Sequence, residues 1–194
     1  ALPNIMVAPN GARRGKSDHA EIPMTDDELV AAAVACAKAG ADGIHFHLRD
    51  ENGRHLLDAD RYQVLLDRLA EAAPGMYLQV TSETAGYYEA SEQQAMMRAL
   101  KPAYVSVGMR EMVCKDADWS AAREFITGPL RMALKFNISF MRPMKWNSLL
   151  MLAPMVVSPA ITNWCYSSKA HMQKGRATVF RSRNTSPHYK QQRV

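Results

Sequence analysis

A short stretch of the chain, GIHFHLRDENGRH at residues 43–55, holds three of its six histidines. His45 and His47 alternate with apolar residues, so in a β-strand their rings point to the same face. Two neighbouring imidazoles can bind one divalent metal ion, and zinc is a common choice. The spacing therefore predicts a metal site at His45 and His47. The alternative is that both rings are ordinary hydrogen-bonded side chains of the core.

Repeated βα units must position these two rings. Apolar runs with the length of buried strands alternate with segments of helical periodicity, and the fourth helix begins at Trp119. Two capping boxes, Thr25 with Glu28 and Ser91 with Gln94, mark helix starts. This alternation predicts parallel strands with right-handed crossovers, in a (β/α)8 barrel or an open doubly wound sheet. The predicted strands are 4–8, 43–48, 76–81 and 103–108, and the predicted helices are 26–40, 59–73 and 91–100.

Polar side chains follow each predicted strand. In parallel α/β folds the functional groups lie at the carboxyl ends of the strands, so these side chains are expected to meet on one rim. Arginines stand in the first loop and directly after the histidine pair. The guanidinium of such an arginine can bind a carboxylate of the substrate. The alternatives are that the side chain is solvated at the surface or closes a loop. The candidates are Asn10, Arg13 and Arg49 for substrate binding, and Thr81, Ser82 and Ser106 for catalysis.

The two parts of the chain differ sharply in charge. Residues 1–124 hold all 19 acidic residues and 13 of the 24 basic ones, a net charge of −6. Residues 125–194 hold the other 11 basic residues and no acid, a net charge of +11. A soluble domain segment of this length usually carries roughly ten acids. We therefore divide the chain into a first (β/α)4 half of a barrel with the metal site (1–124) and an atypical basic segment (125–194).

The cysteines and the apolar runs bear on the compartment. Cys36, Cys114 and Cys165 are far apart and form no Cys-x-x-Cys pair, which disfavours a disulfide framework and a thiolate zinc site. No apolar run has the length of a membrane span or of a signal peptide. These features predict a protein of the reducing cytoplasm.

Three stretches together resemble the beta-keto acid cleavage enzymes: PNGARRGKSDHAEIPMT, AGADGIHFHLRDENGRHLLDADRY and QVTSETAGYY. The resemblance covers about residues 4–125. It implies a (β/α)8 barrel, a divalent metal that is usually zinc, and a homo-oligomer. It also implies a reaction in which a beta-keto acid and acetyl-CoA give acetoacetate and a new acyl-CoA.

Carried over residue by residue, the resemblance makes His45 and His47 metal ligands and places Thr81, with Ser82 beside it, and Ser106 near the substrate. Arg13 stands where some members of the family have a glutamate, which changes the substrate side chain to be expected. The resemblance ends near Glu124 and Phe125, in the middle of a predicted helix.

The family draws a third metal ligand, a glutamate, from a late strand, together with an arginine and an aspartate for acid–base work. No residue after Glu124 is acidic, so the chain lacks counterparts of these carboxylates. A shift of reading frame explains this change, and a genuine basic extension is the alternative. We expect the edge of the strand at 103–108 to remain open and the chain as written to be inactive.

Two other functions fit parts of the sequence. A metal-dependent hydrolase can use the same His-x-His strand without acetyl-CoA. A non-enzymatic protein can bind nucleic acid through the basic segment, where Tyr166, Phe180 and Tyr189 stand among lysines and arginines. The scattered positive charge and the absence of a nucleic-acid-binding motif disfavour the second.

Overall fold

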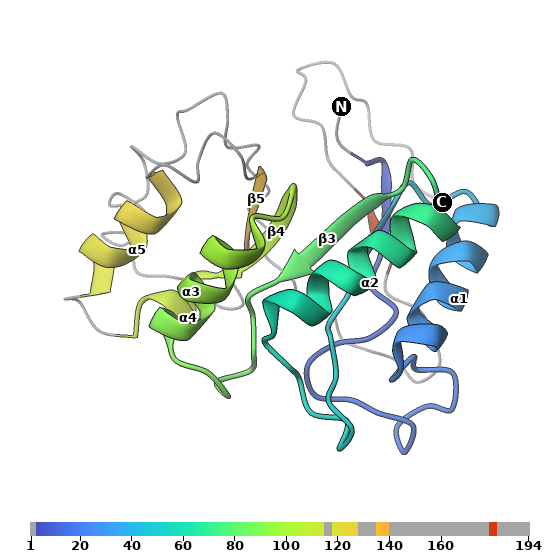
Figure 1. Ribbon diagram of the computed structural model, residues 1–194, viewed down its shortest axis with the longest axis horizontal. Helices are drawn as coiled ribbons and strands as arrows, with labels where there is room; N and C mark the ends of the chain where they lie inside the picture. The colour runs from blue at the N-terminus through green and yellow to red at the C-terminus, as the bar shows by residue number, and fades with distance from the viewer. Residues whose placement is uncertain (1–2, 115–117, 128–134, 140–178, 182–194) are drawn as a thin grey trace, which may run out of the picture.

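The computed structural model describes residues 3–114, 118–127, 135–139 and 179–181, and these form one six-stranded sheet (Figure 1). The strand order is β5-β4-β3-β2-β1-β6. Neighbours from β1 to β5 pair in parallel, and β6 runs antiparallel to β1. The strands are β1 (Ile5–Val7), β2 (Gly43–His45), β3 (Tyr77–Thr81), β4 (Tyr104–Gly108), β5 (Lys135–Ser139) and β6 (Val179–Arg181).

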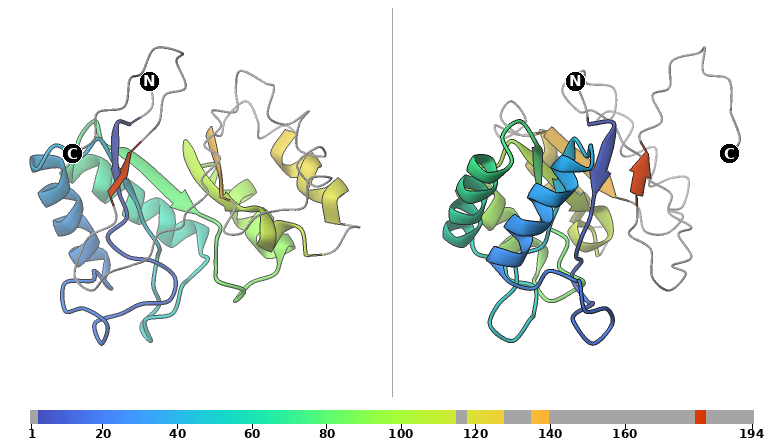
Figure 2. Two further views of the ribbon diagram at one scale, coloured as in Figure 1. Left: turned by 180° about the vertical axis from the view of Figure 1, so that it is seen from behind. Right: turned by 90° about the vertical axis from the view of Figure 1, so that its right-hand side faces the viewer.

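The first three crossover helices are α1 (Asp26–Lys38), α2 (Ala59–Ala72) and α3 (Ala90–Leu100). α1 packs beside α2, and α2 packs beside α3. Figure 2 shows α1 and α2 on the same side of the sheet. Sequential strand order with helices on one face is the winding of a (β/α)8 barrel, whereas a doubly wound sheet reverses its order and carries helices on both faces. The predicted parallel α/β fold of barrel type, seen as a partial barrel, is confirmed.

The two faces of the sheet differ in chemistry because side chains alternate along each strand. One face is apolar and packs under the helices, with the fully buried side chains Ile44, Phe46, Val80, Val105 and Val107. The helices contribute the facing side of this core with Leu29, Ala33, Tyr62, Leu65, Leu69 and Met97. The opposite face carries His45, Gln79, Thr81 and Ser106, so the polar candidates share a face of the sheet.

Local hydrogen bonds define where the helices begin. The capping box predicted for α1 is confirmed: Thr25 Oγ1 accepts from Glu28 N at 3.2 Å, and the Glu28 carboxylate accepts from Thr25 N at 3.1 Å. The box predicted for α3 at Ser91–Gln94 is wrong. Glu92 Oε2 instead accepts from Glu89 N at 2.8 Å, because a carboxylate is a stronger acceptor than an amide at the positive end of a helix.

A fifth parallel strand continues the sheet into the segment in which the sequence loses its regular pattern. α5 (Trp119–Thr127) begins where predicted, after an unpredicted short helix, α4 (Met109–Met112). β5 then pairs with β4 from Tyr104↔Lys135 to Gly108↔Ser139. The expectation of an open edge at 103–108 is therefore wrong. Within the 125–194 segment, the structure describes residues 125–127, 135–139 and 179–181. The rest of this segment lies outside the described residues.

None of the helices in the described part of the chain combines the length and the apolar character that a membrane-spanning helix requires.

Gly43 marks a close approach between β2 and β3. A Cβ added there would lie 2.9 Å from Tyr77 Cβ and 3.2 Å from the Tyr77 carbonyl oxygen. We expect Gly43→Ala to lower the free energy of unfolding by about 1–3 kcal/mol through overpacking, measured by urea denaturation. Gly11→Ala is the control, because its added Cβ would meet nothing within 4 Å. Equal stability of the two variants would contradict this account of the strand contact.

Candidate metal centre and active site

His45 and His47 meet at the carboxyl end of β2. The strand ends at His45, two residues before His47 and earlier than the predicted range. Phe46 N still donates to Gln79 O at 3.3 Å, so the backbone stays against β3 as it leaves the strand. The two Nε2 atoms lie 3.3 Å apart. Two nitrogen ligands of a tetrahedral zinc ion, each at about 2.0–2.1 Å, stand about 3.3–3.4 Å apart, so the pair has the spacing that zinc requires.

Each ring is held through its second nitrogen. Gln79 Oε1 lies 2.9 Å from His45 Nδ1, and an amide oxygen can only accept, so the proton of His45 sits on Nδ1. His47 Nδ1 lies 3.4 Å from His55 Nδ1, and His55 Nε2 lies 3.4 Å from the Tyr62 hydroxyl. Contacts of this kind fix the orientation and the tautomer of metal-binding histidines.

Asn10 supports the backbone of His47. Its Nδ2 donates to His47 O at 2.9 Å and to Pro23 O at 3.1 Å, and its Oδ1 accepts from His47 N at 3.0 Å. The Asn10 side chain is buried. The structure thus places this predicted substrate-binding residue behind the histidine pair, where it fixes the position of His47.

Arg49 is buried and anchors loops. Its Nη1 and Nη2 atoms donate to three backbone carbonyls, those of Ala12 (3.1 Å), Gly53 (2.7 Å) and Arg14 (3.0 Å). Its Nε finds no partner in the described part of the chain. Arg13 lies between two of the anchored residues with its side chain exposed. Arg49 therefore shapes the loop from which Arg13 extends.

The ends of β3 and β4 bring the three predicted catalytic residues together. Thr81 is paired with Ser106 across the strands, and Ser82 N donates to Ser106 O at 2.9 Å. Ser106 Oγ donates to Glu83 Oε1 at 2.9 Å, and Thr81 Oγ1 accepts from Glu83 N at 3.0 Å. Ser82 Oγ is buried and finds no partner in the described residues. Glu83 packs against Gly108, where an added Cβ would lie 2.8 Å from Glu83 Cγ.

The loop after β3 is held by Glu111, which the sequence analysis missed. Its Oε2 accepts from Thr84 N at 2.8 Å, from Thr84 Oγ1 at 3.0 Å and from Gln93 Nε2 at 2.9 Å. Its Oε1 accepts from Ala85 N at 2.9 Å, where the backbone has a φ of 59°. Four donors on one carboxylate fix this loop and, with it, the orientation of the adjoining Ser82–Glu83 segment.

Burial sets the charge state of the histidine cluster. It lowers the pKa of His45 and, helped by neighbouring His45, His55 and Arg49, lowers the pKa of His47 well below its usual value. Burial and the charge of Arg49 lower the pKa of His55 to about 4. All three rings are therefore neutral at pH 7, and neutral imidazole is the form that binds a metal.

These pKa shifts predict a stability that falls in acid. The unfolded chain binds protons below pH 6.5 that the folded cluster excludes, so the stabilisation is complete above pH 6.5 and is lost as the pH falls. For His55, a pKa lowered from 6.5 to about 4 corresponds to a loss of about 3 kcal/mol at pH 4. Urea unfolding of metal-free protein measures this loss. His55→Gln should depend less steeply on pH, and an unchanged slope would contradict the assignment.

The described residues hold no complete metal site. No group of three or more His, Cys, Asp or Glu side chains in the described ranges is arranged to hold a metal ion. Within these ranges His45 and His47 are a pair of candidate ligands. Beyond Glu124 the sequence contains no Asp or Glu. Its Cys and His residues in that segment are Cys165, His171 and His188, which lie outside the described residues.

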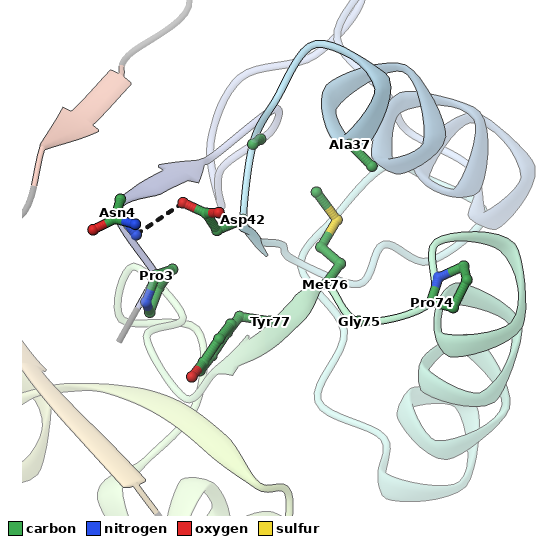
Figure 3. Close-up of a pocket in the computed structure, with 9 residues that line it drawn as sticks. Pro3, Asn4, Ala37, Asp42, Pro74, Gly75, Met76 and Tyr77 are labelled. Carbon is green, nitrogen blue, oxygen red and sulfur yellow. Dashed lines mark hydrogen bonds between the residues drawn. The ribbon is translucent and has the colours of Figure 1, made fainter. Parts of the chain in front are cut away.

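A pocket of about 430 Å³ lies at the other end of the sheet, at the amino ends of the first three strands (Figure 3). Asp42 lines it, and its Oδ2 accepts from the backbone N atoms of Asn4 and Ile5, each at 2.9 Å. This carboxylate holds the start of β1. In barrels the amino ends of the strands serve stability, whereas the carboxyl ends carry the chemistry, so the histidine pair is the candidate site.

The fold and the site define the class of protein. It is a parallel α/β protein with two histidines at its strand ends, spaced as two ligands of one metal ion would be. The family model described as beta-keto acid cleavage enzyme matches residues 4–189. The chain belongs to the family of beta-keto acid cleavage enzymes, and the resemblance seen in its motifs is confirmed. The matched range continues past residue 125, where the recognisable motifs end.

Curated relatives have related names. A 3-oxoadipate:acetyl-CoA acetyltransferase of Cupriavidus necator is 31% identical over 53% of the chain and 36% of its own length. A 3-keto-5-aminohexanoate cleavage enzyme of Acetoanaerobium sticklandii is 25% identical over 63% of the chain and 42% of its own length. A 3-dehydrocarnitine:acetyl-CoA trimethylamine transferase of Rhizobium meliloti is 32% identical over 42% of the chain and 28% of its own length. The chain thus spans less than half the length of these relatives.

Proposed function

We propose that the chain carries the metal-binding half of a beta-keto acid cleavage site. The reaction converts a beta-keto acid and acetyl-CoA into acetoacetate and a new acyl-CoA. The observation that carries this proposal is the pair of buried, neutral histidines whose Nε2 atoms stand 3.3 Å apart at the end of β2, in a chain of this family. The names of the curated relatives support the choice of acetyl-CoA and keto acid substrates.

We propose zinc as the metal and His45 and His47 as two of its ligands. Bound there, a zinc ion supplies a Lewis acid that stabilises negative charge on the keto oxygen of the substrate. Ser82, whose buried Oγ has no partner in the described residues, donates a hydrogen bond to the substrate. Ser106, oriented by Glu83, and Thr81 line the same polar face and fix the substrate beside the metal pair.

We further propose that residues 125–194 do not supply the acid–base half of this site. No carboxylate follows Glu124 in the sequence, so general acid–base catalysis has no acidic residue to use there. The family match to residue 189 and the pairing of β5 with β4 support a family-like fold for part of this segment. A shifted reading frame remains our explanation for the missing acids.

An activity assay of two proteins tests both proposals. One is the 194-residue chain, and the other continues after codon 124 in the alternative reading frame of the genomic DNA. Each is supplied with zinc, acetyl-CoA and a set of beta-keto acids, and acetoacetate and acyl-CoA are measured by mass spectrometry. We expect turnover from the second protein and at least a hundredfold less from the first.

The outcomes separate the two claims. Equal turnover by both proteins would overturn the proposal for residues 125–194. No turnover by either protein would overturn the cleavage reaction itself. Hydrolysis of an ester or amide without acetyl-CoA would favour the metal-dependent hydrolase instead.

The exposed Arg13 suggests the class of keto acid. Arg49 anchors its loop by hydrogen bonds to the carbonyls of the residues on either side. The backbone from which the Arg13 side chain extends is therefore fixed in position. A guanidinium binds a carboxylate through two hydrogen bonds. We propose that the substrate has a second carboxylate at its far end, as 3-oxoadipate does, and that Arg13 binds it.

Reversing the charge at this position should reverse the preference. In the active form of the protein, we expect Arg13→Glu to lower kcat/KM for 3-oxoadipate by about tenfold to a hundredfold, the loss of one charge-assisted hydrogen bond or pair. kcat/KM for a keto acid with an uncharged end should stay within about threefold, since that substrate never contacts the guanidinium. Arg14→Glu, at the exposed neighbouring position, is the matched control. A uniform decline for both substrates would contradict the role of Arg13.

A further inference from the structure

Four side chains form a continuous line from the proposed metal pair into the core. His45 Nε2 lies 3.3 Å from His47 Nε2, His47 Nδ1 lies 3.4 Å from His55 Nδ1, and His55 Nε2 lies 3.4 Å from the Tyr62 hydroxyl. Two ring nitrogens that face each other form a hydrogen bond only when one of them carries a proton. The position of each proton therefore determines the next one along the line.

The line is rigid because every member is fixed from outside. Tyr62 is fully buried on α2, and its hydroxyl oxygen accepts from Leu48 N at 3.3 Å. His55 is 2% exposed, and its ring lies against the backbone of Glu83. An isolated antiparallel β-bridge pairs Arg49 with His55, so after the turn the chain lies again beside the histidine pair. The proton arrangement can therefore change while the heavy atoms stay in place.

Without a cation, one arrangement of neutral rings supplies one proton to each of the four contacts along this line, from Tyr62 to Gln79. Tyr62 donates to His55 Nε2, His55 Nδ1 donates to His47 Nδ1, and His47 Nε2 donates to His45 Nε2. His45 Nδ1 then donates to Gln79 Oε1, an acceptor that ends the line. This arrangement places a proton on His47 Nε2, between the two nitrogens that face each other.

With a cation on both Nε2 atoms, that proton must leave His47 Nε2. A neutral His47 then carries its proton on Nδ1, which requires an unprotonated acceptor at His55 Nδ1. The proton of His55 moves to Nε2 in turn. Binding a cation thus reverses the hydrogen bonds between His47 and Tyr62, while the bond from His45 to Gln79 keeps its direction.

We propose that His55 is a positioning residue for the metal ligand His47: by accepting the Nδ1 proton of His47, it leaves Nε2 free to bind the metal. The inference rests on the proposed metal site and adds a residue that does not contact the metal. Outer contacts of this kind contribute about tenfold to a hundredfold to metal affinity.

Zinc affinity of the whole 194-residue chain, measured by competition with a chromophoric chelator, tests the inference. We expect His55→Phe, which has no acceptor, to bind zinc about tenfold to a hundredfold more weakly. His55→Gln, whose amide oxygen can accept from His47, should recover most of the affinity. Leu65→Ala is the control, because it opens a cavity in the core on the same helix as Tyr62 without removing a hydrogen bond.

A second measurement uses the unaltered protein and so avoids the risk that a variant fails to fold. Long-range ¹H–¹⁵N correlation spectra report which nitrogen of each histidine carries the proton. We expect the His47 proton to move from Nε2 to Nδ1 when zinc is added, and the His55 proton to move from Nδ1 to Nε2.

The outcomes distinguish the inference from the site on which it rests. Zinc binding by the parent that is lost in His45→Ala/His47→Ala, but is unchanged in His55→Phe, would overturn the role of His55 and leave the metal site standing. Unchanged tautomers of His47 and His55 on addition of zinc would also overturn it. A parent chain that binds no zinc would overturn both.

Discussion

Replacing both His45 and His47 with alanine is expected to abolish saturable zinc binding by the chain. The two Nε2 atoms, which we propose as metal ligands, lie 3.3 Å apart, and burial keeps both rings neutral. Removing them leaves no imidazole at the end of β2, so we expect zinc affinity to fall by at least about a hundredfold. Equilibrium dialysis against a range of zinc concentrations, followed by metal analysis, measures this.

A histidine outside the cluster provides the control. His19 is exposed in the first loop, where its Nδ1 accepts from Glu21 N at 3.2 Å. His19→Ala should bind zinc as the parent does. If the double variant keeps the same zinc affinity as the parent and as His19→Ala, the metal site lies elsewhere in the chain.

The second large effect concerns stability. Glu111→Ala removes the acceptor of four hydrogen bonds in the loop after β3 and leaves the N–H groups of Thr84 and Ala85 without their partner. Unsatisfied donors of this kind cost about 1–3 kcal/mol each, and they do not add fully. We therefore expect the free energy of unfolding to fall by about 3–5 kcal/mol, measured by urea denaturation.

Two further variants sharpen this test. Glu111→Gln keeps the shape and one oxygen but loses the charge, so it should lie between the parent and the alanine variant. Glu124→Ala, on the exposed face of α5, should change stability by less than about 0.5 kcal/mol. A Glu111→Ala protein as stable as Glu124→Ala would show that the loop does not depend on this carboxylate.

The sequence predicts the βα framework well because the relevant signals are local. The alternation of buried side chains such as Ile44 and Phe46 with His45 and His47 shows both the strand and the face on which the site lies. The capping residue Thr25 places the start of α1 correctly. β5 alternates polar and apolar residues, as a strand does, but it is only five residues long and stands among segments without a regular pattern. Its pairing with β4 becomes visible only in the assembled sheet.

His55 shows why the rest of the site could not be predicted. Spacing alone makes it a loop residue, eight positions from His47. The turn between them is closed by Asp50, whose Oδ1 accepts from Asn52 N at 2.9 Å and from Arg54 N at 2.8 Å. The Asp-x-Asn-Gly sequence of this turn is a signal for the reversal. The contact of the two rings depends on packing against Tyr62, which the sequence does not display.

The partners of Arg49 and Glu111 could not be predicted, for a related reason. Both satisfy backbone groups of loops that are distant in the sequence, at Ala12 and Arg14 in one case and at Thr84 and Ala85 in the other. A charged residue beside a candidate site suggests substrate binding, but buried charges are often retained to hold loops. The partners of such residues follow from the fold and have no fixed spacing.

Anomalous X-ray diffraction at the zinc edge, from crystals grown with zinc, tests the central claim most directly. The account predicts an anomalous peak within about 2.0–2.1 Å of Nε2 of both His45 and His47. It also predicts that Gln79 and His55 still contact the Nδ1 atoms of these rings. A peak bound elsewhere in the chain, with the two histidine rings free of metal, would contradict it.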